Sequence, residues 1–93
     1  MSIRDALQLK AVTVTIPSGL EVTLRRPSTM DLLAAMEQSK TRPETFGAWL
    51  VQNHLIDGAT KVFLSVEEVL QCDVKLVDEI CIEIEKLYGE GKN

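Results

Sequence analysis

The sequence is poor in the side chains that most protein chemistry requires. It has one histidine, His54, and two cysteines, Cys72 and Cys81, which are nine residues apart and form no C-x-x-C pair. A metal site would need further ligands at fixed spacing, and a nucleophile would need a base and an orienting acid beside it. The five glycines stand singly and form no phosphate-binding loop. We therefore expect no enzymatic activity, no cofactor and no metal, and we expect His54 to be a polar group near a helix end, favoured in its cationic form.

Other absences limit the compartment and the partners. No stretch approaches the roughly 18 apolar residues of a membrane span, and residues 1–10 lack the apolar segment of a secretory signal. Two cysteines are too few for the disulfide framework of a small secreted domain. We expect a cytoplasmic protein with free thiols and no membrane partner.

Charge is divided unevenly along the chain. Residues 1–42 carry six basic and four acidic groups, whereas residues 43–93 carry four basic and ten acidic groups. The net charge of −4 argues against general binding of polyanions. The division can favour head-to-tail contact between copies, although two oppositely charged faces on one domain are more common.

What the sequence does contain is an aliphatic core for one small domain. The chain has 93 residues, of which 45% are hydrophobic. At this size folding hides only about 60–65% of the surface of the unfolded chain, which leaves apolar surface for assembly. We predict a flexible arm at residues 1–10, with a short helix from Ser2 as an alternative, a single α+β domain at 11–89 and a frayed tail at 90–93.

The segment VTVTIPSGLEVTL, residues 12–24, predicts a β-hairpin, because apolar and polar residues alternate on both sides of a turn. A two-residue turn would place Ile16 opposite Glu21, so that an apolar side chain faces a polar one. A three-residue turn with Pro17 first and Gly19 at positive φ puts all six apolar side chains on one face. The predicted pairs are Ile16 with Leu20, Val14 with Val22, and Val12 with Leu24.

Four helices are predicted after the hairpin, each from a capping residue or a proline near its start. In the first of them Leu32, Leu33 and Met36 are expected to face the core. The predicted class is α+β, with an N-terminal antiparallel β-hairpin followed by three to four helices packed on one face. The helices run from Ser28 to about Ser39, from Thr41 to Asp57-Gly58, from Ser65 to Leu70, and from Asp73 to Gly89 and Gly91.

Arg25 and Arg26 allow three interpretations. One of them pairs with an acid such as Asp31, or they contact a partner protein, or they bind nucleic acid together with Lys40. Nucleic-acid binding usually needs more basic residues and stacking aromatic side chains. The whole chain has two Phe, one Trp and one Tyr, so we expect no nucleic-acid partner and keep this function as the alternative.

Residues 11–37 contain a combination that resembles a known family. A threonine-rich strand leads to Arg25-x-Pro27-x-x-x-Asp31 and then to a helix, in the stretch LRRPSTMDLLAAM. This pattern resembles the small tail assembly chaperones of long-tailed bacteriophages, including Mu-like, P2-like and lambdoid phages. Beyond Gln38 only a helical pattern of suitable length continues the likeness.

The resemblance implies a non-enzymatic chaperone of a phage or prophage. It implies binding to the tape measure protein, help in assembling the tail tube protein around it, and absence from the mature virion. The resemblance further implies that the chain forms a homo-oligomer and that a longer frameshifted form of the chain is a partner. A bacterial adaptor or secretion chaperone is another interpretation of the same features.

Client contact is expected from apolar positions on the later helices. Phe46, Trp49 and Ile82 are the candidate anchors, with Arg25 and Arg26 as candidate polar contacts. A position in the core is the favoured alternative for Trp49, and a single exposed isoleucine such as Ile82 is common on protein surfaces.

Overall fold

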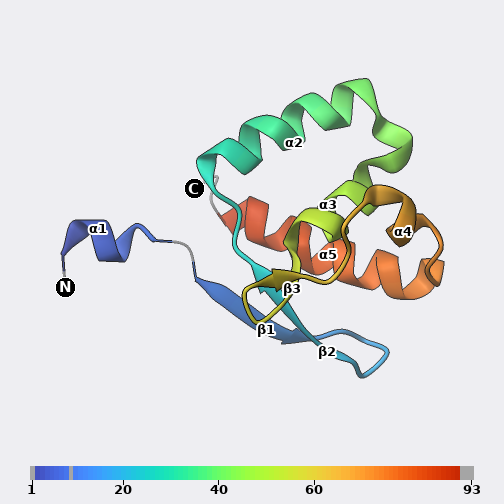
Figure 1. Cartoon of the computed structure of the whole chain (residues 1–93), viewed down its shortest axis with the longest axis horizontal. Helices are drawn as coiled ribbons and strands as arrows, with labels where there is room; N and C mark the ends of the chain where they lie inside the picture. The colour runs from blue at the N-terminus through green and yellow to red at the C-terminus, as the bar shows by residue number, and fades with distance from the viewer. Residues whose placement is uncertain (1, 9, 91–93) are drawn as a thin grey trace.

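The computed structural model describes residues 2–8 and 10–90, and it has the predicted α+β class (Figure 1). Helix α1 (Ile3–Ala6) lies in the predicted arm, and residues 91–93 of the predicted tail lie outside the described part of the chain. The other elements are β1 (Ala11–Thr15), β2 (Glu21–Arg25), α2 (Thr29–Thr41), the 3-10 helix η1 (Pro43–Thr45), α3 (Phe46–His54), β3 (Leu55–Asp57), β4 (Thr60–Lys61), α4 (Val66–Leu70) and α5 (Val74–Glu90).

The hairpin has the predicted register. Val12 lies opposite Leu24 and Val14 opposite Val22. The Ile16 N–H donates to the Leu20 carbonyl at 2.9 Å, which closes the three-residue turn. One detail differs, because the Leu20 side chain at the turn is 51% exposed rather than part of the covered face.

Gly19 has φ +97°, and nothing lies within 4 Å of a Cβ built there. Gly19→Ala is therefore expected to lower the free energy of unfolding by about 1 kcal/mol or more through backbone strain alone. Gly89→Ala is the matched control, since Gly89 lies in α5 at negative φ with the same open space. It should leave stability unchanged or raise it by about 0.5 kcal/mol. Equal loss in both variants in urea titrations would contradict this assignment.

The sheet has two strands that the sequence did not predict. It has the order β1-β2-β3-β4, with Leu24 opposite Leu55 and Ile56 opposite Lys61. The prediction that the second helix continues to Asp57-Gly58 was wrong. Helix α3 ends at His54 and the chain becomes extended, because β3 pairs with the inner edge of the hairpin. Gly58, at φ +65°, forms the turn between β3 and β4.

The helix starts are mostly as predicted. Ser28 forms a capping box with Asp31, Ser65 accepts from the Glu68 N–H at 3.3 Å, and Asp73 accepts from the Lys75 N–H at 2.8 Å. Thr41 was wrongly predicted to open a helix. It is the last residue of α2, and its hydroxyl donates to the Glu37 carbonyl at 3.0 Å.

The ends of α2 and α5 differ from the predicted ends by a few residues. Helix α2 continues two residues beyond Ser39, and η1 begins at Pro43. Helix α5 includes Gly89 and continues to Glu90, so Gly89 does not end it, and Gly91 lies outside the described residues.

The core lies between the apolar face of the hairpin and helices α3, α4 and α5, which cover one side of the sheet (Figure 1). The hairpin turn is also fixed to α5, because the Ser18 N–H and hydroxyl donate to the Glu79 carboxylate at 2.8 and 2.9 Å. The buried core residues are Ile16, Leu24, Ala48, Leu50, Val51, Leu55, Val69, Ile80, Cys81, Ile84 and Leu87.

Helix α2 does not join this core closely. Its one buried residue is Ala35, and Leu32 is only half-buried. Leu33 and Met36 were predicted to face inward, but their side chains are 62% and 52% exposed. The prediction was wrong for both, because α2 stands apart from the sheet and covers other helices only in part (Figure 1).

Candidate protein-binding site

The start of α2 is fixed by the last residue of β2. The Arg25 guanidinium donates to both carboxylate oxygens of Asp31, at 2.7 and 3.3 Å, and to the carbonyl of Asn53 at 3.0 Å. Asp31 also accepts from the Ser28 N–H at 2.8 Å, while its own N–H donates to the Ser28 hydroxyl at 3.0 Å. The predicted pairing of Arg25 with Asp31 is confirmed, and it joins the sheet, α2 and the end of α3 at one point.

The charge state of Asp31 follows from these contacts. Burial alone would raise the pKa of the carboxyl group, but the hydrogen bonds and charge of Arg25 and the hydrogen bonds from Ser28 lower it below the ordinary 3.8. Asp31 is therefore an anion at neutral pH, and the ion pair is maintained.

His54 lies behind this junction and is fully buried. Its Nδ1 is 3.0 Å from the Arg25 carbonyl, and its Nε2 is 2.6 Å from the Tyr88 hydroxyl. A carbonyl can only accept, so Nδ1 carries the proton and Nε2 accepts from Tyr88. Burial, reinforced by the charge of Arg25, lowers the pKa of His54 below 6.5. His54 is the last residue of α3, so the predicted position near a helix end is confirmed. The predicted cationic form is not favoured, because the ring is buried among β2, α3 and α5.

Stability should fall in mild acid because of His54. Its pKa is lowered in the folded state, so the unfolded chain binds more protons as pH falls below the ordinary 6.5. The free energy of unfolding is then expected to decrease with falling pH in that window, and Asp31 should cause a second decrease below 3.8. Urea titrations at several pH values measure both. His54→Gln, which does not titrate, should flatten the upper window only, and an unchanged slope in that variant would contradict the assignment.

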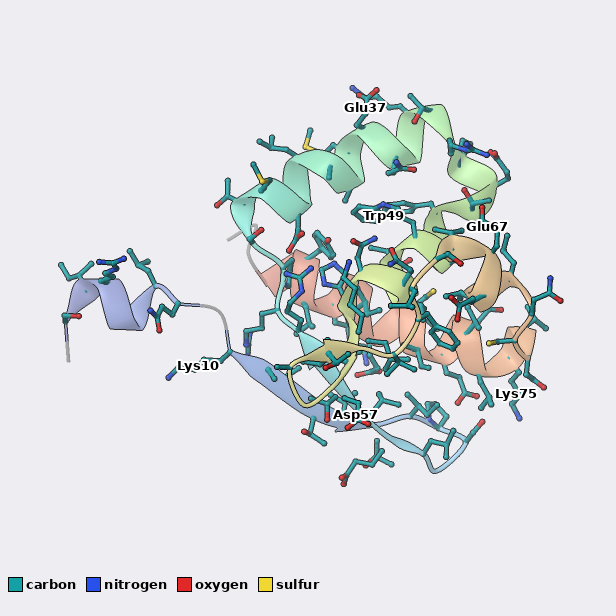
Figure 2. The ribbon with its side chains drawn as sticks, viewed as in Figure 1. Lys10, Glu37, Trp49, Asp57, Glu67 and Lys75 are labelled. Atoms are coloured by element: carbon teal, nitrogen blue, oxygen red, sulfur yellow. The ribbon has the colours of Figure 1, made fainter. Side chains whose placement is uncertain are left out.

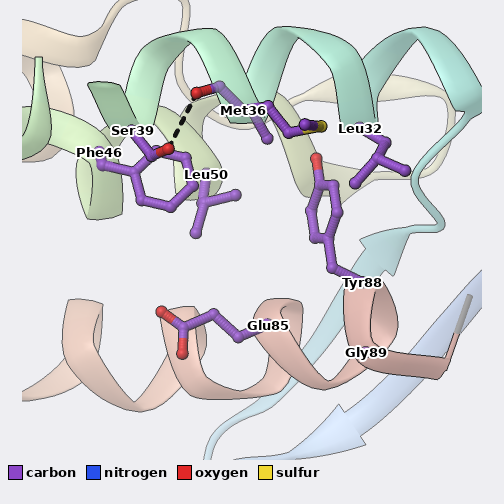
Figure 3. A pocket seen from close by; sticks show the side chains of 9 residues that line it. Leu32, Met36, Ser39, Phe46, Leu50, Glu85, Tyr88 and Gly89 are labelled. Carbon is purple, nitrogen blue, oxygen red and sulfur yellow. Dashed lines mark hydrogen bonds between the residues drawn. The ribbon is translucent and has the colours of Figure 1, made fainter. Parts of the chain in front are cut away.

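An apolar pocket of about 300 Å³ lies between α2 and α5, and we call it the α2–α5 groove. Figure 3 shows Leu32 and Met36 of α2 above it and Tyr88 of α5 pointing up towards them. Glu85 of α5 is the one ionisable carboxylate in its lining. The lining residues are Leu32, Ala35, Met36, Ser39, Phe46, Leu50, Glu85, Tyr88 and Gly89.

The outer surface of α2 beside this groove is also apolar. Met30 is 79% exposed, and with Leu33 and Met36 it adds three large apolar side chains within two turns. Side chains three residues apart on a helix lie on neighbouring surface. The groove and this surface therefore form a continuous apolar region on the least packed helix of the domain.

The structure places the five predicted site residues differently. Phe46 lines the groove. The Trp49 ring stacks on the Phe46 ring, with the two ring centroids 6.1 Å apart. Trp49 lies beneath α2 (Figure 2), is partly buried against the core and lines a second pocket of about 270 Å³. Ile82 is 53% exposed on α5 and lines neither pocket, so the structure does not bring it together with the other two.

The two arginines also differ in exposure. The Arg25 side chain is half-buried and bonds to Asp31 and to the Asn53 carbonyl, and the exposed Arg26 follows it directly after β2. The Arg25 guanidinium is therefore held within the fold by these contacts.

Sequence reasoning missed the α5 side of the groove. Neither Glu85 nor Tyr88 was among the predicted site residues, although both line the groove. Their spacing of three residues put them on adjacent faces, but only the placement of α2 opposite α5 shows that both line one pocket.

Comparison of the chain with protein-family models, with curated proteins and with solved structures finds no match. Among the described residues there is no helix of the length and apolarity that a membrane crossing requires. The same residues include no group of three or more His, Cys, Asp or Glu placed to hold a metal ion. Cys72 and Cys81 are free thiols, and burial raises the pKa of Cys81 to about 11.

Proposed function

We propose that this protein is a tail assembly chaperone of a phage or prophage, a non-enzymatic module that binds the tape measure protein. In this function it assists assembly of the tail tube in the host cytoplasm and does not enter the mature virion. The observation that carries the proposal is the α2–α5 groove together with the exposed apolar side chains of α2. An apolar groove between two helices suits the apolar face of a third helix.

The charge beside the groove suggests which helices fit. Glu85 is part of the lining and its side chain is exposed. A client helix with apolar residues at positions i, i+3 and i+4 and a lysine or arginine on the flank would complement both features. Several copies along a long helical client would gain affinity from avidity.

The geometry of the family-like segment supports the resemblance. Arg25 and Asp31, two residues of the Arg-x-Pro-x-x-x-Asp pattern, form the ion pair that sets the direction of α2. In this proposal the Arg25–Asp31 pair positions the client-binding helix α2 and does not itself contact the client.

The nucleic-acid alternative depends on Arg25 and Arg26. Arg25 is already bonded to Asp31 and Asn53, so its guanidinium could contact phosphate only by leaving them. Retention on DNA at low salt that weakens in Arg26→Ala and falls steeply with salt would favour this alternative. We expect no such retention.

Co-expression with the tape measure protein of the same phage or prophage tests the proposal. We expect a client that is insoluble alone to become soluble with this chain and to co-purify with it. Equal insolubility with and without the chain would contradict the proposal. Co-purification with secreted or unrelated bacterial clients instead would favour the adaptor or secretion-chaperone interpretation.

A further inference from the structure

The strand β1 forms one edge of the sheet, and its hydrogen-bonding pattern is fixed by the turn. The Ile16 N–H donates to Leu20, so residues 16, 14 and 12 bond across the hairpin and residues 15, 13 and 11 do not. The contact of 3.4 Å between the Thr13 and Thr23 hydroxyls fits the closer spacing of a pair that is not hydrogen-bonded. The backbone N–H and C=O groups of Ala11, Thr13 and Thr15 therefore point away from β2, and in the described residues no segment pairs with that side.

The two edges of the sheet differ in how they resist pairing with another chain. The edge strand β4 has only two residues and carries Lys61, which are common features of a protected edge. The edge strand β1 has five residues, AVTVT, without a charge, a proline or a glycine. These residue types favour strands, so this edge is suited to adding a further strand.

We propose that β1 pairs with β1 of a second copy of this chain, antiparallel and about a twofold axis at Thr13. This register joins all three outward-pointing residues, with Thr13 opposite the partner subunit's Thr13 and Ala11 opposite the partner subunit's Thr15. The two hairpins then form one continuous sheet. Shifting the β1–β1 register by one residue would place the valines of one copy on the same face as the threonines of the other. Shifting it by two residues would leave one of the three outward-pointing residues unpaired.

The side chains match in the same register. Val12 and Val14 are half-buried and lie on the helix-covered side, whereas Thr13 is exposed on the other side. A twofold axis perpendicular to the sheet places Val12 beside the partner subunit's Val14, so the exposed parts of the valines cover one another. Thr13 meets the partner subunit's Thr13 on the polar side.

Charge favours a second copy at this edge rather than at another apolar surface. Each chain carries −4, and its acidic side chains are concentrated after residue 42, including five on α5. Contact between two α5 surfaces would bring like charges together, whereas a β1 seam contains no charge. The client is proposed to bind the α2–α5 groove, so this inference concerns a different surface and does not depend on the proposed function.

The oligomeric state of the pure chain tests the inference, with Thr13→Pro as the decisive variant. The Thr13 N–H points outward, so proline at 13 removes no bond of the hairpin and is tolerated at an edge. Sedimentation equilibrium of the wild type should give twice the 10.3 kDa of one chain. Thr13→Pro should weaken self-association about 100-fold while the circular dichroism spectrum is unchanged.

Two further variants keep the inference testable if Thr13→Pro fails to fold. Thr13→Lys retains the backbone N–H but places two like charges across the axis, and it should also give monomers. Thr13→Val, which keeps the N–H and adds no charge, should remain dimeric. A monomeric wild type would overturn the inference. The open edge of β1 would then be suited to pairing with a strand of another protein. A dimer that persists in both the Pro and Lys variants would overturn it as well, because the contact would then lie elsewhere.

Discussion

Met36→Glu is expected to weaken binding of the tape measure protein about 100-fold, the loss that follows from removing a central apolar contact. Met36 lines the α2–α5 groove and is 52% exposed before any client binds. A glutamate there would be buried by the client and would lie in the same pocket as Glu85, so two carboxylates would be brought together. Isothermal titration with client segments predicted to form amphipathic helices measures the loss.

The folded state should tolerate this change, because the side chain faces solvent in the free protein. Leu64→Glu is the matched control, since Leu64 is 79% exposed and lines none of the pockets described here. It should leave the affinity within about twofold of the wild type. Ile82→Ser tests the separate prediction of an anchor on α5. If Met36→Glu bound as tightly as the wild type, the client would not use the groove.

Arg25→Met is expected to lower the free energy of unfolding by about 2–3 kcal/mol. The substitution leaves the Asp31 carboxylate without its cation and the Asn53 carbonyl without its donor. The side chains of Arg25 and Asp31 are 30% and 19% exposed, so solvent screening keeps the loss below that of a fully buried pair. Urea titration gives the difference.

Arg42→Met is the matched control for this change, because Arg42 and Glu44 are 3.9 Å apart and both about two-thirds exposed. It should alter stability by less than about 0.5 kcal/mol. The double variant Arg25→Met with Asp31→Leu should recover part of the loss, since no unpaired carboxylate remains. A loss in Arg25→Met no larger than in Arg42→Met would mean that the junction does not hold α2.

The elements predicted correctly are those with strong local signals. The hairpin register followed from the alternation of residues 12–24 and from the turn with Pro17 and Gly19, two requirements with one solution. The helix starts at Ser28, Ser65 and Asp73 followed from side chains that cap the first turn.

The strands β3 and β4 could not be predicted in the same way. They have three and two residues, too few to show a period of two. The segment from Leu55 to Asp57 is extended because β2 offers it an edge, and this is a tertiary effect. His54 was misjudged for a related reason, since its burial depends on Tyr88, 34 residues away.

The candidate site was predictable only in part. The pairing of Arg25 with Asp31 was foreseen because the two residues flank one turn. Phe46, a candidate anchor, lines the groove, and its role as an anchor stays a prediction. The apolar residues of α2 suggested a helix packed on the core, yet the junction at Ser28 and the 3-10 turn at Pro43 carry this helix away from the sheet. The groove arises from that separation, which no local pattern encodes.

Amide hydrogen exchange of this protein with and without a bound client segment tests the central claim most directly. If the client lies in the α2–α5 groove, protection should increase in α2, over Thr29–Thr41, and in the last turns of α5 around Tyr88, while β1 and α4 remain unchanged. Protection confined to α4, β1 or the hairpin turn, with α2 exchanging as in the free protein, would contradict the account.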